Sequence, residues 1–488
     1  MTENKTKIGS KKVMDNMAWR LAERLGAKGV EFLVSIVLAR LLAPDMFGVV
    51  ALCTVFISLI QVFVDSGLGN ALIQKKDADD TDFSTVFYFN ILFCLLLYLL
   101  LFFAVAPLAA RFYDNPQLTP LIRVLGITIL ISGLKNIQQA YVSKHLLFRR
   151  FFFATLGGTI AAAVVGIVMA YTGFGVWAIV AQHIVNLVVD TIILWFTVRW
   201  RPKLLFSFQR LKQLYSYGWK LLASQLLEKL YIEIRQLLIG KYYTSADLAF
   251  YNRARQFPQF ITANVNTSIN SVLFPAMSSV QDDRERVKAM TRRAMKTSVY
   301  IMSPFMVGLA VCGEQIVSIL LTDKWLPLVP YLYVFSATHL FLPVHTSNLN
   351  AIKAMGRSDL FLKLEILKKV VGFTAVVITL PISVMAMAMS MLVTNVIAQI
   401  INSWPNRKLL GYSYLEQLKD IVPYMLIAAG MGAVVYCVKF LNLPHIPTLL
   451  IQIVVGAAIY IGISKLLNLE IYNYLIGMLK SFVKKRKA

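Results

Sequence analysis

Apolar stretches of about 18 or more residues recur along the whole chain, and short polar segments separate them. An α-helix needs a run of about that length to cross a hydrocarbon core roughly 30 Å thick. Because only helices and closed barrels can span a bilayer, runs this long and continuous predict transmembrane helices. We place about fourteen of them, near 17–41, 46–72, 84–108, 118–142, 151–172, 174–198, 214–240, 248–275, 292–316, 327–350, 360–381, 383–403, 421–440 and 446–467.

Composition agrees with this pattern. Of the 488 residues, 58% are hydrophobic and only 15% are charged, against about 25% charged in an average soluble domain. A soluble protein of this size would have too few polar side chains to cover its surface. The sequence therefore predicts an all-α integral membrane protein and excludes an ordinary globular enzyme and a disordered or fibrous chain.

The distribution of basic residues predicts the orientation. With a cytoplasmic N-terminus, most of the 49 Lys and Arg residues fall in segments facing the cytoplasm. The opposite side receives only Arg40, Arg111, Lys241, Lys324 and Lys439. This bias predicts that both termini are cytoplasmic. The net charge of +24 then needs no nucleic-acid partner. We also expect no cleavable signal peptide, because residues 1–16 are polar and the first span carries charges.

The two halves of the chain resemble each other. Trp19 and Arg20 open the first span, and Trp219 and Lys220 open the seventh. A basic connector at 144–150 has a counterpart at 353–363, and six spans per half predict parallel repeats. The predicted parts are a tail at 1–16, an N-lobe at 17–198, a linker at 199–213, a C-lobe at 214–404, a linker with two further spans at 405–468, and a basic cytoplasmic tail at 469–488.

The first span carries five ionisable residues on one side. Arg20, Glu23, Arg24, Lys28 and Glu31 fall within an arc of about 140° around the helix. Charged residues inside membrane spans usually face a bundle interior or a water-filled cavity. The alternative for Arg20 and Arg24 is that their side chains extend to the cytoplasmic interface.

The seventh span carries a second set of charges. Lys220, Glu228 and Arg235 share an arc of about 80°. Lys229 and Glu233 are four residues apart, a spacing that predicts an ion pair along the helix. The first three residues are therefore the better candidates for a cavity.

Two further charged positions lie in the eighth and second spans. Arg253 and Arg255 point about 200° apart, and Arg255 shares its side with amide-bearing residues, which favours it as the cavity cation. Asp65 is a lone carboxylate near the end of the second span. It is either a partner for a helix end or a site for a coupling ion, and both interpretations stay open.

A stripe of cations inside a membrane bundle favours an anionic ligand, most simply a phosphate-bearing headgroup, because guanidinium groups bind phosphate oxygens in pairs. Nearby carboxylates could bind Na⁺ or protons. The candidate substrate-binding residues are Arg24, Lys28, Arg255, Arg20, Lys220 and Arg235, and the candidate coupling or counter-charge residues are Glu23, Glu31, Asp65 and Glu228.

Motifs for catalysis or cofactors are absent from the sequence. There is no Walker A pattern, no zinc-binding HExxH and no nucleophile elbow, so we expect a transporter that does not hydrolyse ATP. The five histidines are scattered. The cysteines lie singly in apolar segments, which predicts small buried side chains and neither a metal site nor a disulfide: Cys53, Cys94, Cys312 and Cys437.

Short motifs in order along the chain resemble a known family. They are Val37-Leu38-Ala39-Arg40-Leu41-Leu42 with Phe47-Gly48, Asp65 through Lys75, Asn115-Pro116-Gln117-Leu118, Tyr251-Asn252-Arg253-Ala254, Leu273-Phe274-Pro275-Ala276 with Gln281-Asp282-Asp283, and Lys324-Trp325. The chain resembles the polysaccharide-transporter (oligosaccharide flippase) family of the multidrug/oligosaccharidyl-lipid/polysaccharide exporter superfamily, and within it the colanic-acid and lipopolysaccharide exporters.

The resemblance implies a two-lobed bundle whose central cavity is lined by the first, second, seventh and eighth spans. It implies alternating access that carries a polyprenyl-diphosphate-linked oligosaccharide from the cytoplasmic to the periplasmic leaflet, with membrane lipids and the polysaccharide polymerase machinery as partners. One alternative is a multidrug or small-cation antiporter of the same superfamily, which would need an acidic and aromatic cavity. A membrane glycan polymerase or ligase is a third interpretation, which the short periplasmic loops disfavour.

Overall fold

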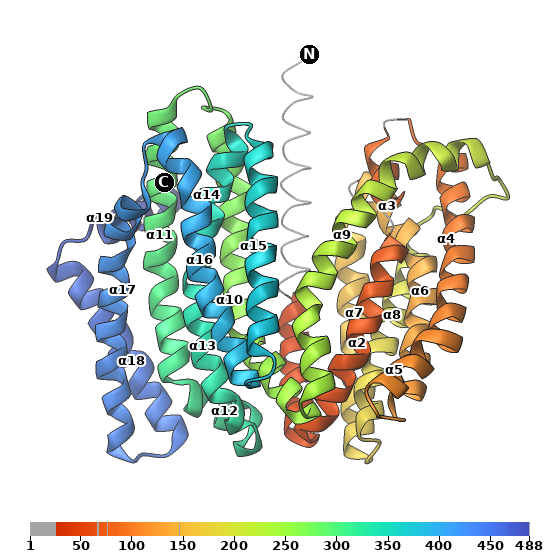
Figure 1. The fold of residues 1–488 in the computed structure, drawn as a ribbon, viewed down its shortest axis with the longest axis horizontal. Coiled ribbons are helices and arrows are strands. Elements are labelled where there is room, and N and C mark those ends of the chain that lie inside the picture. The colour runs from red at the N-terminus through yellow and green to blue at the C-terminus, as the bar shows by residue number, and fades with distance from the viewer. Residues whose placement is uncertain (1–25, 66–67, 76, 146, 488) are drawn as a thin grey trace. The chain divides into compact units, whose positions relative to one another are not determined.

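The computed structural model describes residues 26–65, 68–75, 77–145 and 147–487, and all regular structure in these ranges is helical (Figure 1). The prediction of an all-α membrane fold is confirmed. The chain divides into two compact units, residues 1–249 and 250–488, each with its own core. The division falls near the start of α10, whereas the sequence placed a linker at 199–213; the predicted boundaries of the lobes stay a prediction.

Unit 1 is a bundle of helices that begins with a described helix at 26–41. The others are α2 (Pro44–Asp65), α3 (Leu68–Gln74), α4 (Asp80–Leu100), the π-helical turn η1 (Leu101–Val105), α5 (Ala106–Phe112), α6 (Leu118–Lys144), α7 (Phe148–Tyr171), α8 (Val176–Thr197) and α9 (Phe208–Tyr242). Within it, α7 packs along α8, and α6 packs against α2, α4 and α8.

Unit 2 is a second bundle, which α10 (Ser245–Ser278) enters. It contains α11 (Arg284–Val311), α12 (Gly313–Leu321), the 3₁₀ turn η2 (Asp323–Leu328), α13 (Val329–Leu340), α14 (Leu342–Ala354), α15 (Ser358–Thr379), α16 (Val384–Leu410), α17 (Tyr414–Cys437), η3 (Val438–Leu441), α18 (His445–Leu466) and α19 (Glu470–Lys487). Here α11 packs against α13, α14 and α17, and α15 packs along α16.

Ten helical segments in the described part of the chain are long and apolar enough to cross a membrane. Each corresponds to one of the predicted spans, from Pro44–Gln74 to His445–Leu466. The predicted spans at 214–240, 248–275 and 360–381 are also helical, as α9, α10 and α15, but their charged and amide residues keep them below this level of hydrophobicity. The predicted span at 17–41 begins outside the described residues, and the total of about fourteen stays a prediction.

The helices bury many polar side chains and expose many large apolar ones. This is the arrangement expected of a bundle whose solvent is lipid. Phe103, Phe196 and Ile382 are among many large apolar residues on the outside, whereas Gln138 and Asn348 are fully buried. Buried amides must find hydrogen-bond partners because lipid offers none. The chain is therefore a multi-pass membrane protein.

Close backbone contacts fix where α2 meets its neighbours in unit 1. A Cβ atom at Gly48 would overlap the backbone of Ser245, at the start of α10. A Cβ atom at Gly240 of α9 would come within 2.9 Å of the Leu52 side chain on α2. Glycine is required at position 48 because backbone atoms lie too close for a side chain, whereas a Cβ atom at position 240 would displace only the end of the flexible Leu52 side chain. This explains the Phe47-Gly48 motif in physical terms.

A buried amide network joins α14, α16 and α17 in unit 2. The Asn348 amide donates to Gln417 at 2.9 Å, and Gln417 donates back to Asn348 at 3.1 Å. Ser403 donates to the same Gln417 oxygen, and Asn406 donates to Asn348. All four residues are fully buried. The network fixes how three helices pack, because a shift of one would leave several amides without partners.

The structure departs from two expectations in unit 2. Residues after 404 were expected to form a polar linker, but α16 and α17 leave only 411–413 between them. Gly411 ends α16 in the left-handed conformation, with φ at 59°, and the Ser413 and Glu416 side chains form a capping box that starts α17. The prediction of four buried cysteines is wrong for one of them, because Cys437 is exposed at the last residue of α17.

Candidate functional site

Part of the predicted cation stripe on the first helix lies outside the described residues, namely Arg20, Glu23 and Arg24. The structure does place the deeper pair. The Lys28 ammonium contacts the Glu31 carboxylate at 2.7 Å, and both side chains are more than half exposed. The two residues therefore form an ion pair along the helix that is largely exposed among the described residues.

Helix α9 carries an ion pair and also a buried arginine that has no carboxylate partner among the described residues. The predicted ion pair between Lys229 and Glu233 is confirmed at 2.8 Å, and Gln236 also donates to Glu233. Arg235 is only 6% exposed, and among the described residues its Nε finds no hydrogen-bond acceptor. Glu228 is exposed on the same helix, and the Lys220 side chain lies outside the described part. Arg235 is thus a buried cation that lacks a described carboxylate partner.

Helix α10 carries two arginines in different surroundings. Arg253 is buried, with its guanidinium 5.5 Å from the centre of the Trp325 ring and a hydrogen bond to Gln256 at 3.1 Å. Arg255 is half-buried and makes no ion pair with any residue that the structure describes. The geometry gives Arg253 a packing role within unit 2, and the role of Arg255 as a ligand-binding cation stays a prediction. Sequence periodicity favoured the same residue.

Asp65 lies at the edge of a polar pocket inside unit 1. Its Oδ1 accepts hydrogen bonds from Gln61 at 3.2 Å and from Asn136 of α6 at 3.0 Å. The pocket has a volume of about 310 Å³, and α2, α3, α4, α6 and α9 contribute its walls. The carboxylate is therefore tied to α6 rather than left at a bare helix end.

An ion pair between α6 and α8 is the feature that sequence reasoning missed. The Lys135 ammonium donates to the Asp190 carboxylate, and only 12% and 8% of the two side chains are exposed. Both residues lie inside predicted spans, and a charged residue in a span usually has a functional role or a partner of opposite charge. Their positions in the sequence gave no sign that they are partners. Lys135 directly precedes Asn136, which itself donates to the Val64 carbonyl and to Asp65, so adjacent residues of α6 contact α8 and α2.

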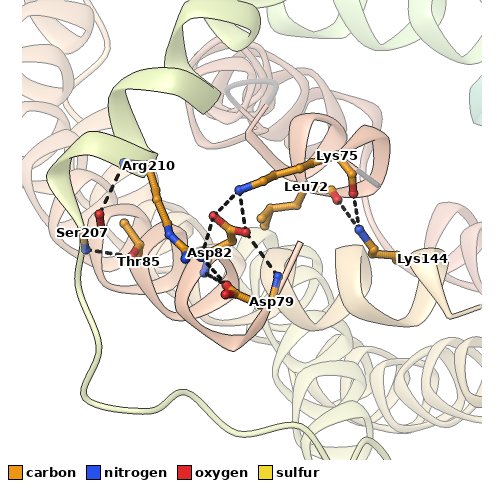
Figure 2. Close-up of polar contacts among 8 residues, drawn as sticks. All are labelled: Leu72, Lys75, Asp79, Asp82, Thr85, Lys144, Ser207 and Arg210. Carbon is orange, nitrogen blue, oxygen red and sulfur yellow. Dashed lines mark hydrogen bonds and ion pairs between the residues drawn. The ribbon is translucent and has the colours of Figure 1, made fainter. Parts of the chain in front are cut away.

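A cluster of charges holds one end of unit 1 together (Figure 2). Asp82 is fully buried and accepts both bonds from Lys75 at 2.7 Å, while Arg210 of α9 contacts it at 3.4 Å and contacts Asp79 at 2.5 Å. The Lys144 ammonium, at the end of α6, donates to the backbone carbonyls of Leu72 and Lys75. The cluster therefore fastens the start of α9 and the end of α6 to the connection between α3 and α4.

This cluster makes the stability of unit 1 sensitive to acid. The hydrogen bond from Arg210, with a smaller contribution from the backbone N–H of Asp82, lowers the pKa of Asp79 from 3.8 to about 2. A lowered carboxyl pKa adds stability that is complete above about pH 4 and is lost as the pH falls toward 2. We expect Arg210→Gln to lower the thermal unfolding midpoint at pH 6 and the difference from wild type to shrink by pH 3. Lys212→Gln is the exposed control on the same helix; a difference that stays constant with pH would contradict this assignment.

The described residues contain no group of three or more His, Cys, Asp or Glu side chains placed to hold a metal ion. The candidate residues that the structure describes carry guanidinium, ammonium, carboxylate and amide groups. These groups suit the binding of phosphates and hydroxyls.

Comparison with known proteins places the chain in a family. The model of the family described as polysaccharide biosynthesis protein matches residues 37–330. The chain belongs to this family. Its relatives include the succinoglycan biosynthesis transport protein ExoT of Rhizobium meliloti strain 1021, 24% identical over 98% of this chain and 97% of the relative. The lipopolysaccharide biosynthesis protein WzxC of Escherichia coli K12 is 23% identical over 87% of this chain and 88% of its own.

Solved structures show the fold of this family member. The lipid II flippase MurJ superimposes with a TM-score of 0.77 at 15% identity, over 94% of this chain and all of the MurJ chain. A multidrug resistance MATE family transporter of the same superfamily gives a TM-score of 0.63 at 16% identity, over 81% of this chain and 94% of that one. These likenesses show that the chain has the same fold as these two membrane transporters.

Proposed function

We propose that this chain is a flippase that moves a polyprenyl-diphosphate-linked oligosaccharide from the cytoplasmic to the periplasmic leaflet by alternating access, without ATP hydrolysis. The observation that carries the proposal is its match over almost the full length to a transport protein of succinoglycan biosynthesis. The product would serve the synthesis of a surface polysaccharide, with the polymerase machinery acting on it in the periplasmic leaflet.

The charges inside the helices support an anionic substrate. Arg235 and Arg255 are cations within long helices, and neither has a carboxylate partner among the described residues. A cation within a membrane bundle is costly without a partner, so a ligand of opposite charge is the simplest explanation for Arg235, which is buried, and for Arg255, which is half-buried. A diphosphate offers several oxygens that a guanidinium can bind in pairs. A carrier of cationic drugs would instead favour carboxylates at these positions.

The membrane potential can assist this transport. The basic bias of the loops supports cytoplasmic termini in an inner membrane, so the substrate headgroup would leave the negative side. Each elementary charge moved across 100 mV contributes about 2.3 kcal/mol. Outward movement of a diphosphate is thus favoured by the potential alone. Asp65, Glu23 and Glu31 are the candidate residues for any additional coupling to Na⁺ or protons.

Proteoliposomes test this function. We expect the purified chain to accelerate translocation of a diphosphoprenyl oligosaccharide over protein-free vesicles, and an inside-negative potential to increase the rate of outward movement. Efflux of small cationic dyes without movement of the lipid-linked sugar would replace the proposal with the antiporter. Polymerisation or transfer of the glycan by the purified chain would instead indicate an enzyme.

A further inference from the structure

The polar pocket in unit 1 has a lining unlike that of a phosphate site. Its walls carry one carboxylate, five amide side chains and one hydroxyl, together with an apolar floor. They are Asp65, Asn70, Asn90, Asn136, Gln139, Gln225 and Ser143, with Val64, Leu68, Gly69, Ile73, Val86, Ile137 and Ala140. None of these is a Lys or Arg, and the Asp65 carboxylate would repel a phosphate. The pocket therefore suits a neutral ligand rich in hydroxyl groups.

The hydrogen bonds around Asp65 also disfavour a bare cation. Gln61 and Asn136 both turn their amide N–H groups toward Oδ1, so two donors occupy the surroundings of that oxygen. A cation needs several oxygens converging on one point. The volume of about 310 Å³ is far larger than a single ion requires and lies at the lower end of small-molecule pockets, which span about 300–1,000 Å³. A carboxylate held by such donors is well placed to accept bonds from ligand hydroxyls.

The walls of the pocket are held in place by the fold. Asn90 donates to the Gly133 carbonyl at 3.2 Å and is buried, so its position on α4 is fixed against α6. Asn136 on α6 donates to the Val64 carbonyl at 3.5 Å and to Asp65 at 3.0 Å, both on α2. Polar groups held in this way lose little conformational entropy when a ligand binds. The pocket is therefore preorganised.

We propose that this pocket binds sugar residues of the transported oligosaccharide, with Asp65, Asn136 and Gln225 as hydrogen-bonding groups and Val64, Leu68 and Ile137 contacting the C–H faces of the ring. The inference rests on the proposed function and adds a glycan subsite to it. Gln225 and Arg235 are ten residues apart on α9, about 15 Å along the helix. One helix would then carry a sugar contact and a phosphate contact at separate positions.

Binding measurements with two probes test the subsite. The probes are the free oligosaccharide, released by mild acid from lipid-linked substrate of the host membrane, and polyprenyl diphosphate without sugars. We expect Asp65→Asn and Gln225→Ala to weaken binding of the free oligosaccharide about tenfold or more, since each removes hydrogen bonds to the ligand. Binding of polyprenyl diphosphate should not change. Asp77→Asn and Gln209→Ala are matched controls at exposed positions outside the pocket.

The possible outcomes separate the subsite from the proposed function. Oligosaccharide affinity at the wild-type level in both pocket variants would overturn the subsite, as would failure of the wild-type chain to bind the free oligosaccharide. Loss of Na⁺-dependent thermal stabilisation in Asp65→Asn, with oligosaccharide binding intact, would make the pocket a cation site instead. The wild-type chain could also fail to translocate the lipid-linked sugar in proteoliposomes while still binding the free oligosaccharide through Asp65. In that case the flippase proposal fails and the sugar site stands.

Discussion

Arg255→Ala is expected to reduce export of the lipid-linked oligosaccharide at least tenfold while leaving the amount of folded protein in the membrane unchanged. The Arg255 guanidinium makes no ion pair with any described residue, so its removal leaves no protein carboxylate unpaired. A hydrogen bond to a charged group contributes about 1.5–3 kcal/mol, which corresponds to roughly a tenfold to hundredfold change in affinity. The loss should therefore appear in transport rather than in stability. Translocation in proteoliposomes, beside thermal unfolding of the same preparation, measures both.

Two variants control this prediction. Arg255→Lys should keep part of the activity because it keeps the charge but loses paired binding to phosphate. Arg149→Ala should be milder, because Arg149 lies near the start of α7 with its guanidinium 5.6 Å from the Phe153 ring. The same comparison with Arg24→Ala tests the first helix. Near-normal export by the Ala variants of Arg24, Arg149 and Arg255 would rule out the cavity cations.

Lys135→Met is expected to destabilise the protein by about 3–5 kcal/mol, the usual cost of removing one partner of a buried ion pair. The substitution leaves the Asp190 carboxylate between α6 and α8 with no cation beside it. In addition, α6 would lose its contact with α8 at the residue before Asn136, so oligosaccharide binding at the pocket should weaken in the same variant. Denaturant unfolding in detergent micelles measures the first effect, and the free-oligosaccharide assay measures the second.

The double variant Lys135→Met/Asp190→Leu separates charge from packing. Replacement of both charges by apolar side chains of similar volume should restore most of the lost stability, since buried pairs are often no more stable than such a substitute. Lys203→Met is the matched control, because its ion pair with Asp80 is largely exposed and exposed pairs contribute little to stability. A double variant as unstable as Lys135→Met would show that the ion pair is not what stabilises this contact.

Within α9, the sequence was sufficient to predict one pair of charges. Lys229 and Glu233 are one helical turn apart, and the predicted contact is present. The opposite directions of Arg253 and Arg255 also followed from helical periodicity, and only Arg253 is buried against an aromatic ring. These predictions succeeded because the α-helix fixes the relative direction of nearby side chains. The binding role of the first helix stays a prediction, and the structure adds only that Lys28 and Glu31 pair with each other.

The sequence by itself determined that this protein is a helical membrane protein and where most of its helices lie. The reason is local: in lipid, each segment must satisfy its own backbone hydrogen bonds, so apolar length and helix are linked. Only the tertiary structure decided which polar groups meet. Lys135 and Asp190 are 55 residues apart, and Asp65 and Asn136 are 71 apart. Such contacts depend on how the helices pack against one another, and no pattern within a single helix specifies that packing.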